Sequence, residues 1–134
     1  MELTSEDKIN LFEQRAPQLF RVLIDEFGYE LNEVKTIYHT GIKWAVHYIY
    51  SNIEKKLKII IKQEPCYTDY GFSVLIFDTK TGNYNILYHI EHHLQDKKFN
   101  FLTRASQKLF LSQDTVALIN GNKPISRNPV NIMP

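Results

Sequence analysis

The stretch IKWAVHYIY, residues 42–50, alternates its side chains with the period of a β-strand. One face of this predicted strand carries Ile42, Trp44, Val46, Tyr48 and Tyr50. The other face carries Lys43, Ala45, His47 and Ile49. Because a face of large apolar side chains has to be covered, the strand is expected in a sheet that packs against other elements on one side.

Four further segments with strand character surround this stretch, at residues 31–38, 57–62, 72–77 and 84–90. Residues 39–41 and 79–83 have the composition of turns. Parallel strands need long crossover connections, so these short links predict an antiparallel meander. The segment 72–77 is apolar on both faces except at Ser73, which predicts a strand inside the sheet.

The N-terminal region is predicted to be helical, because apolar residues from Ile9 to Phe27 recur at steps of three and four. Thr4 and Asp7 have the spacing of a capping box at its start. Pro17 predicts either two abutting helices or one kinked helix.

A second helical region is predicted at residues 102–111. Residues 116–119 fit either a last short helix, capped by Ser112 or Asp114, or a final strand. The sequence therefore predicts an α+β fold, in which an N-terminal helix or helix pair and a C-terminal helix pack on one antiparallel sheet of about five strands. Residues 1–121 would form this single domain, and residues 122–134 an extended or mobile tail rich in proline.

The composition is that of one soluble globular domain: 134 residues, 43% hydrophobic, 23% charged, with a net charge of +1. It excludes a disordered or collagen-like chain, and one cysteine excludes a disulfide scaffold. The polar N-terminus and the single cysteine favour the cytoplasm, and no apolar run has the length of a membrane span. Since the lysines are dispersed and arginines are few, we expect no nucleic-acid partner.

Histidines 89, 92 and 93 with Asp96 form the best candidate for a metal site, because on a helix these four residues would share a face. However, the strand predicted at 84–90 runs into His89 and would separate it from His92. Solvated histidines are the competing interpretation, and we expect no metal and no cofactor.

Two surfaces have the composition of protein contacts. Tyr67, Asp69 and Tyr70 combine two amphipathic rings with a carboxylate, although the same loop also fits a turn that needs Asp69 and Gly71 only for its geometry. The second surface is acidic, and it comprises Glu26, Glu30 and Glu33. A pocket between sheet and helices, with His47, Tyr88 and His89 as its polar groups, is the alternative for a small ligand.

The run Leu23 to Leu31, the strand from Trp44 to Tyr50 and the segment Leu57 to Ile61 resemble small bacterial proteins of the toxin-immunity type. The resemblance covers roughly residues 19–90 and concerns the layout of the chain, so no site residue is transferred by it. It implies a cytoplasmic, non-catalytic protein that binds and blocks a partner toxin. The alternative is a small-ligand-binding or enzymatic domain, and either is compatible with a homo-oligomer.

Overall fold

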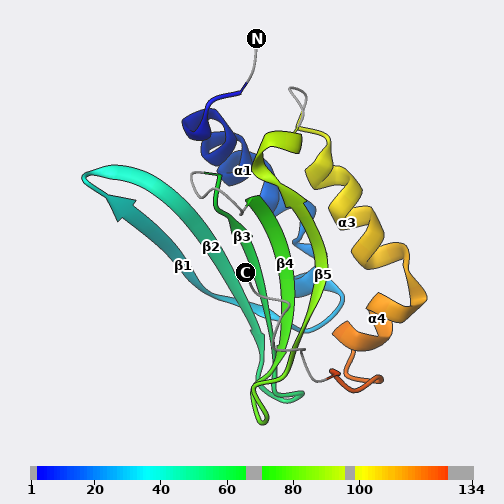
Figure 1. The fold of residues 1–134 in the computed structure, drawn as a ribbon. Helices are drawn as coiled ribbons and strands as arrows, with labels where there is room; N and C mark the ends of the chain where they lie inside the picture. The colour runs from blue at the N-terminus through cyan, green and yellow to red at the C-terminus, as the bar shows by residue number, and fades with distance from the viewer. Residues whose placement is uncertain (1–2, 66–70, 96–98, 127–134) are drawn as a thin grey trace.

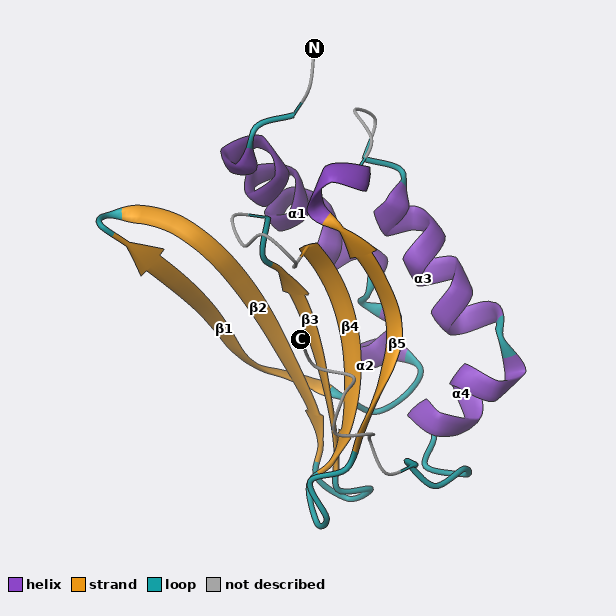
Figure 2. Ribbon diagram, in the orientation of Figure 1, coloured by secondary structure: helices purple, strands orange, loops and turns teal. Residues whose placement is uncertain are grey.

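The computed structural model describes residues 3–65, 71–95 and 99–126. Five strands form one antiparallel sheet in chain order: β1 (Glu30–His39), β2 (Ile42–Asn52), β3 (Leu57–Gln63), β4 (Gly71–Asp78) and β5 (Tyr84–Glu91). The α-helices are α1 (Ser5–Leu19), α2 (Val22–Asp25), α3 (Phe101–Leu111) and α4 (Gln113–Ile119), with a 3-10 turn, η1 (His92–Leu94), after β5. Figures 1 and 2 show these α-helices on one side of the sheet. The predicted α+β fold with an antiparallel meander is confirmed.

The helix ends follow the local sequence. Thr4 and Asp7 form the predicted capping box at the start of α1, each side chain bonding the other's backbone N–H at 3.0 Å. Pro17 lies in the last turn of α1, which ends at Leu19, and the separate α2 follows, so the region is two abutting helices. Ser112 caps α4, which decides the open choice at residues 116–119 in favour of a helix.

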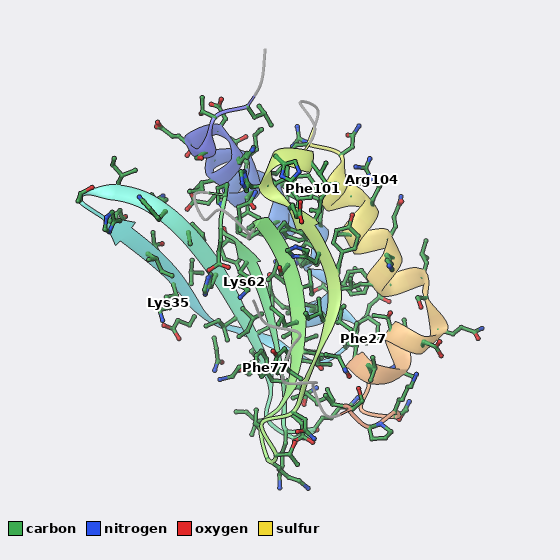
Figure 3. All side chains as sticks on the ribbon, viewed as in Figure 1. Phe27, Lys35, Lys62, Phe77, Phe101 and Arg104 are labelled. Atoms are coloured by element: carbon green, nitrogen blue, oxygen red, sulfur yellow. The ribbon has the colours of Figure 1, made fainter. Side chains whose placement is uncertain are left out.

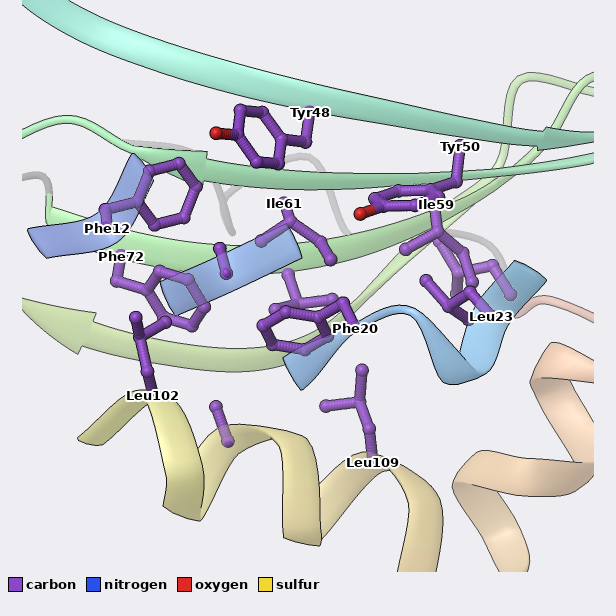
Figure 4. Packing of buried hydrophobic residues seen from close by; sticks show 14 of the residues in the cluster. Phe12, Phe20, Leu23, Tyr48, Tyr50, Ile59, Ile61, Phe72, Leu102 and Leu109 are labelled. Carbon is purple, nitrogen blue, oxygen red and sulfur yellow. The ribbon is translucent and has the colours of Figure 1, made fainter. Parts of the chain in front are cut away.

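The core fills the space between the sheet and the helices. Phe72 of β4 lies at its centre, with ring centroids 6.1 Å from Phe12, 6.4 Å from Phe20 and 5.3 Å from Phe101. Figure 4 shows the surrounding side chains, which come from both helical regions and from the covered face of the sheet: Leu23, Tyr48, Tyr50, Ile59, Ile61, Leu102 and Leu109. Burial of these apolar surfaces is the main force that holds the two layers together.

The chain after α4 returns to the domain. Ile125 is buried in the core, and the backbone and side chain of Ser126 bond the Asn85 amide of β5 at 3.2 and 2.6 Å. Residues 125 and 126 of the predicted tail therefore pack on the domain, and the tail after residue 126 is outside the described residues.

Two irregularities in the β1–β2 pair decide which side chains face the helices. The register shifts between Leu31 and Glu33 and again between Ile37 and Tyr38, where Trp44 is the extra residue on β2. Lys43 consequently bonds Glu13 of α1 at 3.0 Å. The sequence alternation, which placed Lys43 on the face of Ala45 and His47, is thus wrong at this end of β2.

Candidate functional site

The side of the sheet that faces away from the helices, here called the open face, is organised in three rows that cross all five strands. The strand registers define the polar row as Lys35, His47, Lys62, Ser73 and His89. The apolar row begins with a carboxylate and continues with four aliphatic residues: Glu33, Ile49, Ile60, Leu75 and Ile86. The third row is Glu30, Ser51, Lys58, Phe77 and Tyr84. Figure 3 labels Lys35, Lys62 and Phe77, one on each of three different strands.

The apolar row places four aliphatic side chains next to one another on the open face. Ile86 is 40% exposed, and Ile49 and Ile60 are half-buried. Leu75, which lies between Ile60 and Ile86, is buried. The rings of Phe77 and Tyr84 stack beside this row with centroids 5.1 Å apart. A row of adjacent aliphatic and aromatic side chains on a face that no described helix covers is typical of a surface that binds another protein.

The polar row contains a partly buried charge cluster around Glu64, which follows β3. Oε2 of Glu64 lies 3.1 Å from Nε2 of His47, and Oε1 lies 3.5 Å from Nζ of Lys62. Burial of the Glu64 carboxyl raises its pKa, but the hydrogen bond with His47 and the charge of Lys62 outweigh this effect and lower the pKa. Glu64 is therefore ionised at neutral pH and holds the side chains of His47 and Lys62 on the open face.

Further along the same row, Oγ of Ser73 lies 2.9 Å from Nδ1 of His89. A serine nucleophile needs a histidine that a third group orients, usually a carboxylate. No carboxylate in the described part of the chain bonds His89, because Glu64 is engaged with His47 and Glu91 with His93. Within residues 3–65, 71–95 and 99–126 the pair is a cross-strand polar contact between β4 and β5.

An acidic corner lies where the start of β1 meets the β2–β3 turn, and it comprises Glu30 and Glu54, which line one hollow, and Glu33 further along β1. Glu26 lies at the end of α2, before this corner in the chain. The β-bulge at Asn32 pairs Glu30 with Ser51 and Glu33 with Ile49, so both carboxylates project from the open face although their spacing is odd. Glu30 and Glu54 line a hollow of about 280 Å³, and the neighbouring Ile53 is 79% exposed. The corner therefore presents an apolar side chain among carboxylates.

Lys55, in the same turn, contacts the segment after α4. The stem of Lys55 lies beside Gly121, since a Cβ built on Gly121 would be 3.5 Å from Cδ of Lys55.

The structure separates the residues that the sequence analysis assigned to a ligand pocket. His47 and His89 share the polar row, whereas Tyr88 faces the helices, with its ring 6.0 Å from Phe72 and 5.8 Å from Nζ of Lys108. The loop residues Tyr67, Asp69 and Tyr70, and also Asp96, lie outside the described residues.

The histidine segment spans two elements, with His89 in β5 and His92 and His93 in η1. The rings of His92 and His93 are 5.6 Å apart, and His93 bonds Glu91 at 3.3 Å. Over residues 3–65, 71–95 and 99–126, no three His, Cys, Asp or Glu side chains converge as a metal site would require.

Sequence reasoning missed Glu64 and Lys62 as site residues. Their spacing of two at the end of a strand puts both side chains on one face, which is a signal that the sequence does contain. Their proximity to His47 depends on the register of β2 with β3, which the sequence does not specify.

Comparison with known proteins gives no match, whether to a family model, to a curated protein sequence or to a solved structure. Among the helices in the described part of the chain, none combines the length and the apolar character needed to cross a membrane.

Proposed function

We propose that this chain is a non-catalytic protein-binding domain of the immunity type, and that its partner, a toxin domain, docks on the open face of the sheet. The observation that carries the proposal is the apolar row, in which Ile49, Ile60, Leu75 and Ile86 lie side by side on four neighbouring strands. Sheets with one solvated face normally alternate apolar and polar residues, so a continuous apolar row on that face calls for a partner.

The charged side chains around the apolar row orient the bound partner. Carboxylates gather at the β1 side, in the acidic corner, while Lys58 and Lys62 flank the apolar row in the middle of the sheet. A partner with a basic patch opposite the corner matches this division, and such complementarity acts mainly on the rate of association and on the choice of partner.

The interior supports a binding role over the alternative of a ligand pocket between sheet and helices. Phe12, Phe20, Ile61, Phe72 and Leu102 have no exposed surface, because they fill the space between the two layers. The hollows beside Phe77 and beside Glu30 lie at the periphery, and a third, of about 350 Å³, lies between the start of α1 and the β1–β2 turn. A small ligand would have to displace packed side chains to enter the interior.

The direct test is binding to the product of the gene adjacent to this one, in a catalytically inactivated form if it is toxic. Isothermal titration should give a stable complex with the wild-type chain. Ile86→Asp should weaken the complex by about tenfold or more, since it puts a charge in the apolar row. Leu111→Asp is the matched control, because Leu111 is 79% exposed at the end of α3 in the helical layer.

A second variant tests the acidic corner. Glu30→Gln with Glu33→Gln should slow association and flatten its dependence on salt concentration, with a smaller effect on dissociation. The proposal fails if Ile86→Asp binds as well as the wild type. It also fails if the adjacent product does not bind and the purified domain instead turns over a small metabolite.

A further inference from the structure

Strand β1 forms a free edge of the sheet. In the described structure it pairs with β2 alone, and α2 is the helix that packs most against it. Residues 33–39 contain no proline, and the register shift between Ile37 and Tyr38 has its extra residue, Trp44, on β2 and none on β1. Such an edge presents a row of unused backbone N–H and C=O groups to any chain that can pair with it.

The opposite edge is protected. Helix α3 packs against β5, and the side chain of Asn85 is tied to Ser126 by two hydrogen bonds. Pairing at β5 would meet this segment, so β1 is the edge that is open to another strand.

Two large apolar side chains of β1 are exposed on the same face. Val34 pairs with Tyr48, whose ring packs on Phe12 of α1, and Tyr38 pairs with Lys43, which bonds Glu13 of α1. Both Val34 and Tyr38 therefore lie on the helix side of the sheet, yet Val34 is 50% and Tyr38 62% exposed. They are four residues apart, and Thr36 lies midway between them.

We propose that β1 pairs antiparallel with β1 of a second copy of this chain, about a two-fold axis at Thr36. In this register Val34 of each copy lies opposite Tyr38 of the other, and a β-branched residue opposite an aromatic ring is a favourable cross-strand pair. On the open face, the Glu33 carboxylate lies opposite the His39 imidazole of the other copy, whose ring N–H can donate a hydrogen bond to it. A shift by one residue would put Val34 opposite a residue of the wrong face, so the alternation selects the register.

The product is a continuous ten-stranded sheet with the helices of both copies on the same side. The two open faces become one surface, while their side chains stay available, because edge pairing uses backbone groups. Seven residues per copy form a small interface, so we expect a weak dimer that forms as concentration rises. This inference does not depend on the proposed partner, and it stands or falls without one.

The first test measures the oligomeric state by sedimentation velocity from micromolar concentrations up to about 1 mM. The wild-type chain should shift from monomer to dimer. Val34→Lys and Tyr38→Glu should each remain monomeric alone, since both positions are exposed and tolerate a polar side chain. An equimolar mixture of the two variants should dimerise again, because the register puts the lysine of one opposite the glutamate of the other.

The second test fixes the register by disulfide formation, in a Cys66→Ser background that removes the native thiol. Thr36→Cys should give a covalent dimer under mild oxidation, because residues directly opposite in an antiparallel pair have Cα atoms about 4.5–5.5 Å apart. Glu33→Cys is the control and should not cross-link, since the two copies of residue 33 lie six positions apart in this register. A wild-type chain that stays monomeric, a dimer that survives both charge variants, or cross-linking through residue 33 in place of residue 36 would each overturn the proposal.

Discussion

Nε2 of His47 lies 3.1 Å from Oε2 of Glu64, and the Glu64 side chain in this pair is only 9% exposed. The contact joins β2 to the residue that follows β3. It makes the stability of the sheet dependent on the ionisation of one carboxyl group.

The pKa of Glu64 is lowered from its ordinary value of 4.5, because the His47 bond and the Lys62 charge outweigh burial. A carboxyl with a depressed folded-state pKa adds stability that is complete above the unfolded value and is lost as pH falls through the folded value. We therefore expect the difference in unfolding free energy between wild type and Glu64→Gln to shrink as the pH falls below the ordinary carboxyl value of 4.5. Urea unfolding of both proteins at several pH values measures this difference in unfolding free energy. Glu91→Gln, in an exposed pair with His93, should show no such trend.

The side-chain amides of Gln63 and Gln95 bond each other reciprocally, at 2.8 and 2.9 Å, in a buried position. Gln63→Leu should cost about 2 kcal/mol of unfolding free energy, because it leaves the Gln95 amide buried without its partner. Gln63→Leu combined with Gln95→Leu should cost less than the sum of the single substitutions. Chemical denaturation of the wild type, the two single variants and the double variant measures this double-mutant cycle. Additive costs would show that the two amides do not depend on each other.

Gly71 begins β4 where the backbone of β5 passes very close. A Cβ at this position would lie 2.3 Å from the carbonyl oxygen of Ile90 and 2.5 Å from the backbone nitrogen of His92. Gly71→Ala should therefore destabilise the fold by about 3 kcal/mol or prevent folding, since backbone cannot move aside cheaply. Gly41→Ala has open space but a φ of +79°, and should cost only about 1–2 kcal/mol. Thermal unfolding by circular dichroism ranks the two, and equal costs would contradict the close approach.

The hydroxyl of Tyr29 donates a buried hydrogen bond of 2.8 Å to the carbonyl oxygen of Ile119, and burial raises its pKa. Tyr29→Phe should lower the unfolding free energy by about 1–2 kcal/mol, because the Ile119 carbonyl loses its partner. Tyr38→Phe serves as the control, since the Tyr38 side chain is exposed and its change should be close to zero. Similar losses for both variants would mean that the Tyr29 bond contributes nothing.

Local sequence patterns were sufficient to predict the architecture of the fold. The alternation around Tyr48 and Tyr50, the capping box at Thr4 and the short turns at residues 39–41 and 79–83 all act within a few residues, so the sequence displays them directly. An antiparallel meander also pairs neighbours in sequence, which leaves few alternatives for strand order.

The β-bulges were not predicted from the sequence, and the positions of Glu33 and Lys43 depend on them. The extra residue Asn32 places Glu33 on the same face of the sheet as Glu30. The extra residue Trp44 places Lys43 on the face that the helices cover. A bulge is selected by packing on both strands of a pair, so a single strand does not reveal it. The cluster of His47, Lys62 and Glu64 was hidden for a related reason, since its members meet only through strand register.

Early and late segments of the chain pack together over the sheet, which the middle of the chain forms. Lys8 bonds the backbone of His92, and Tyr29 bonds the backbone of Ile119, so early and late segments depend on each other. During synthesis on the ribosome all five strands emerge before α3 and α4, which supply Leu102, Leu109 and Ile119 to the core. The nascent sheet is then covered by α1 and α2 alone, and native packing is completed only after the last helix has left the tunnel.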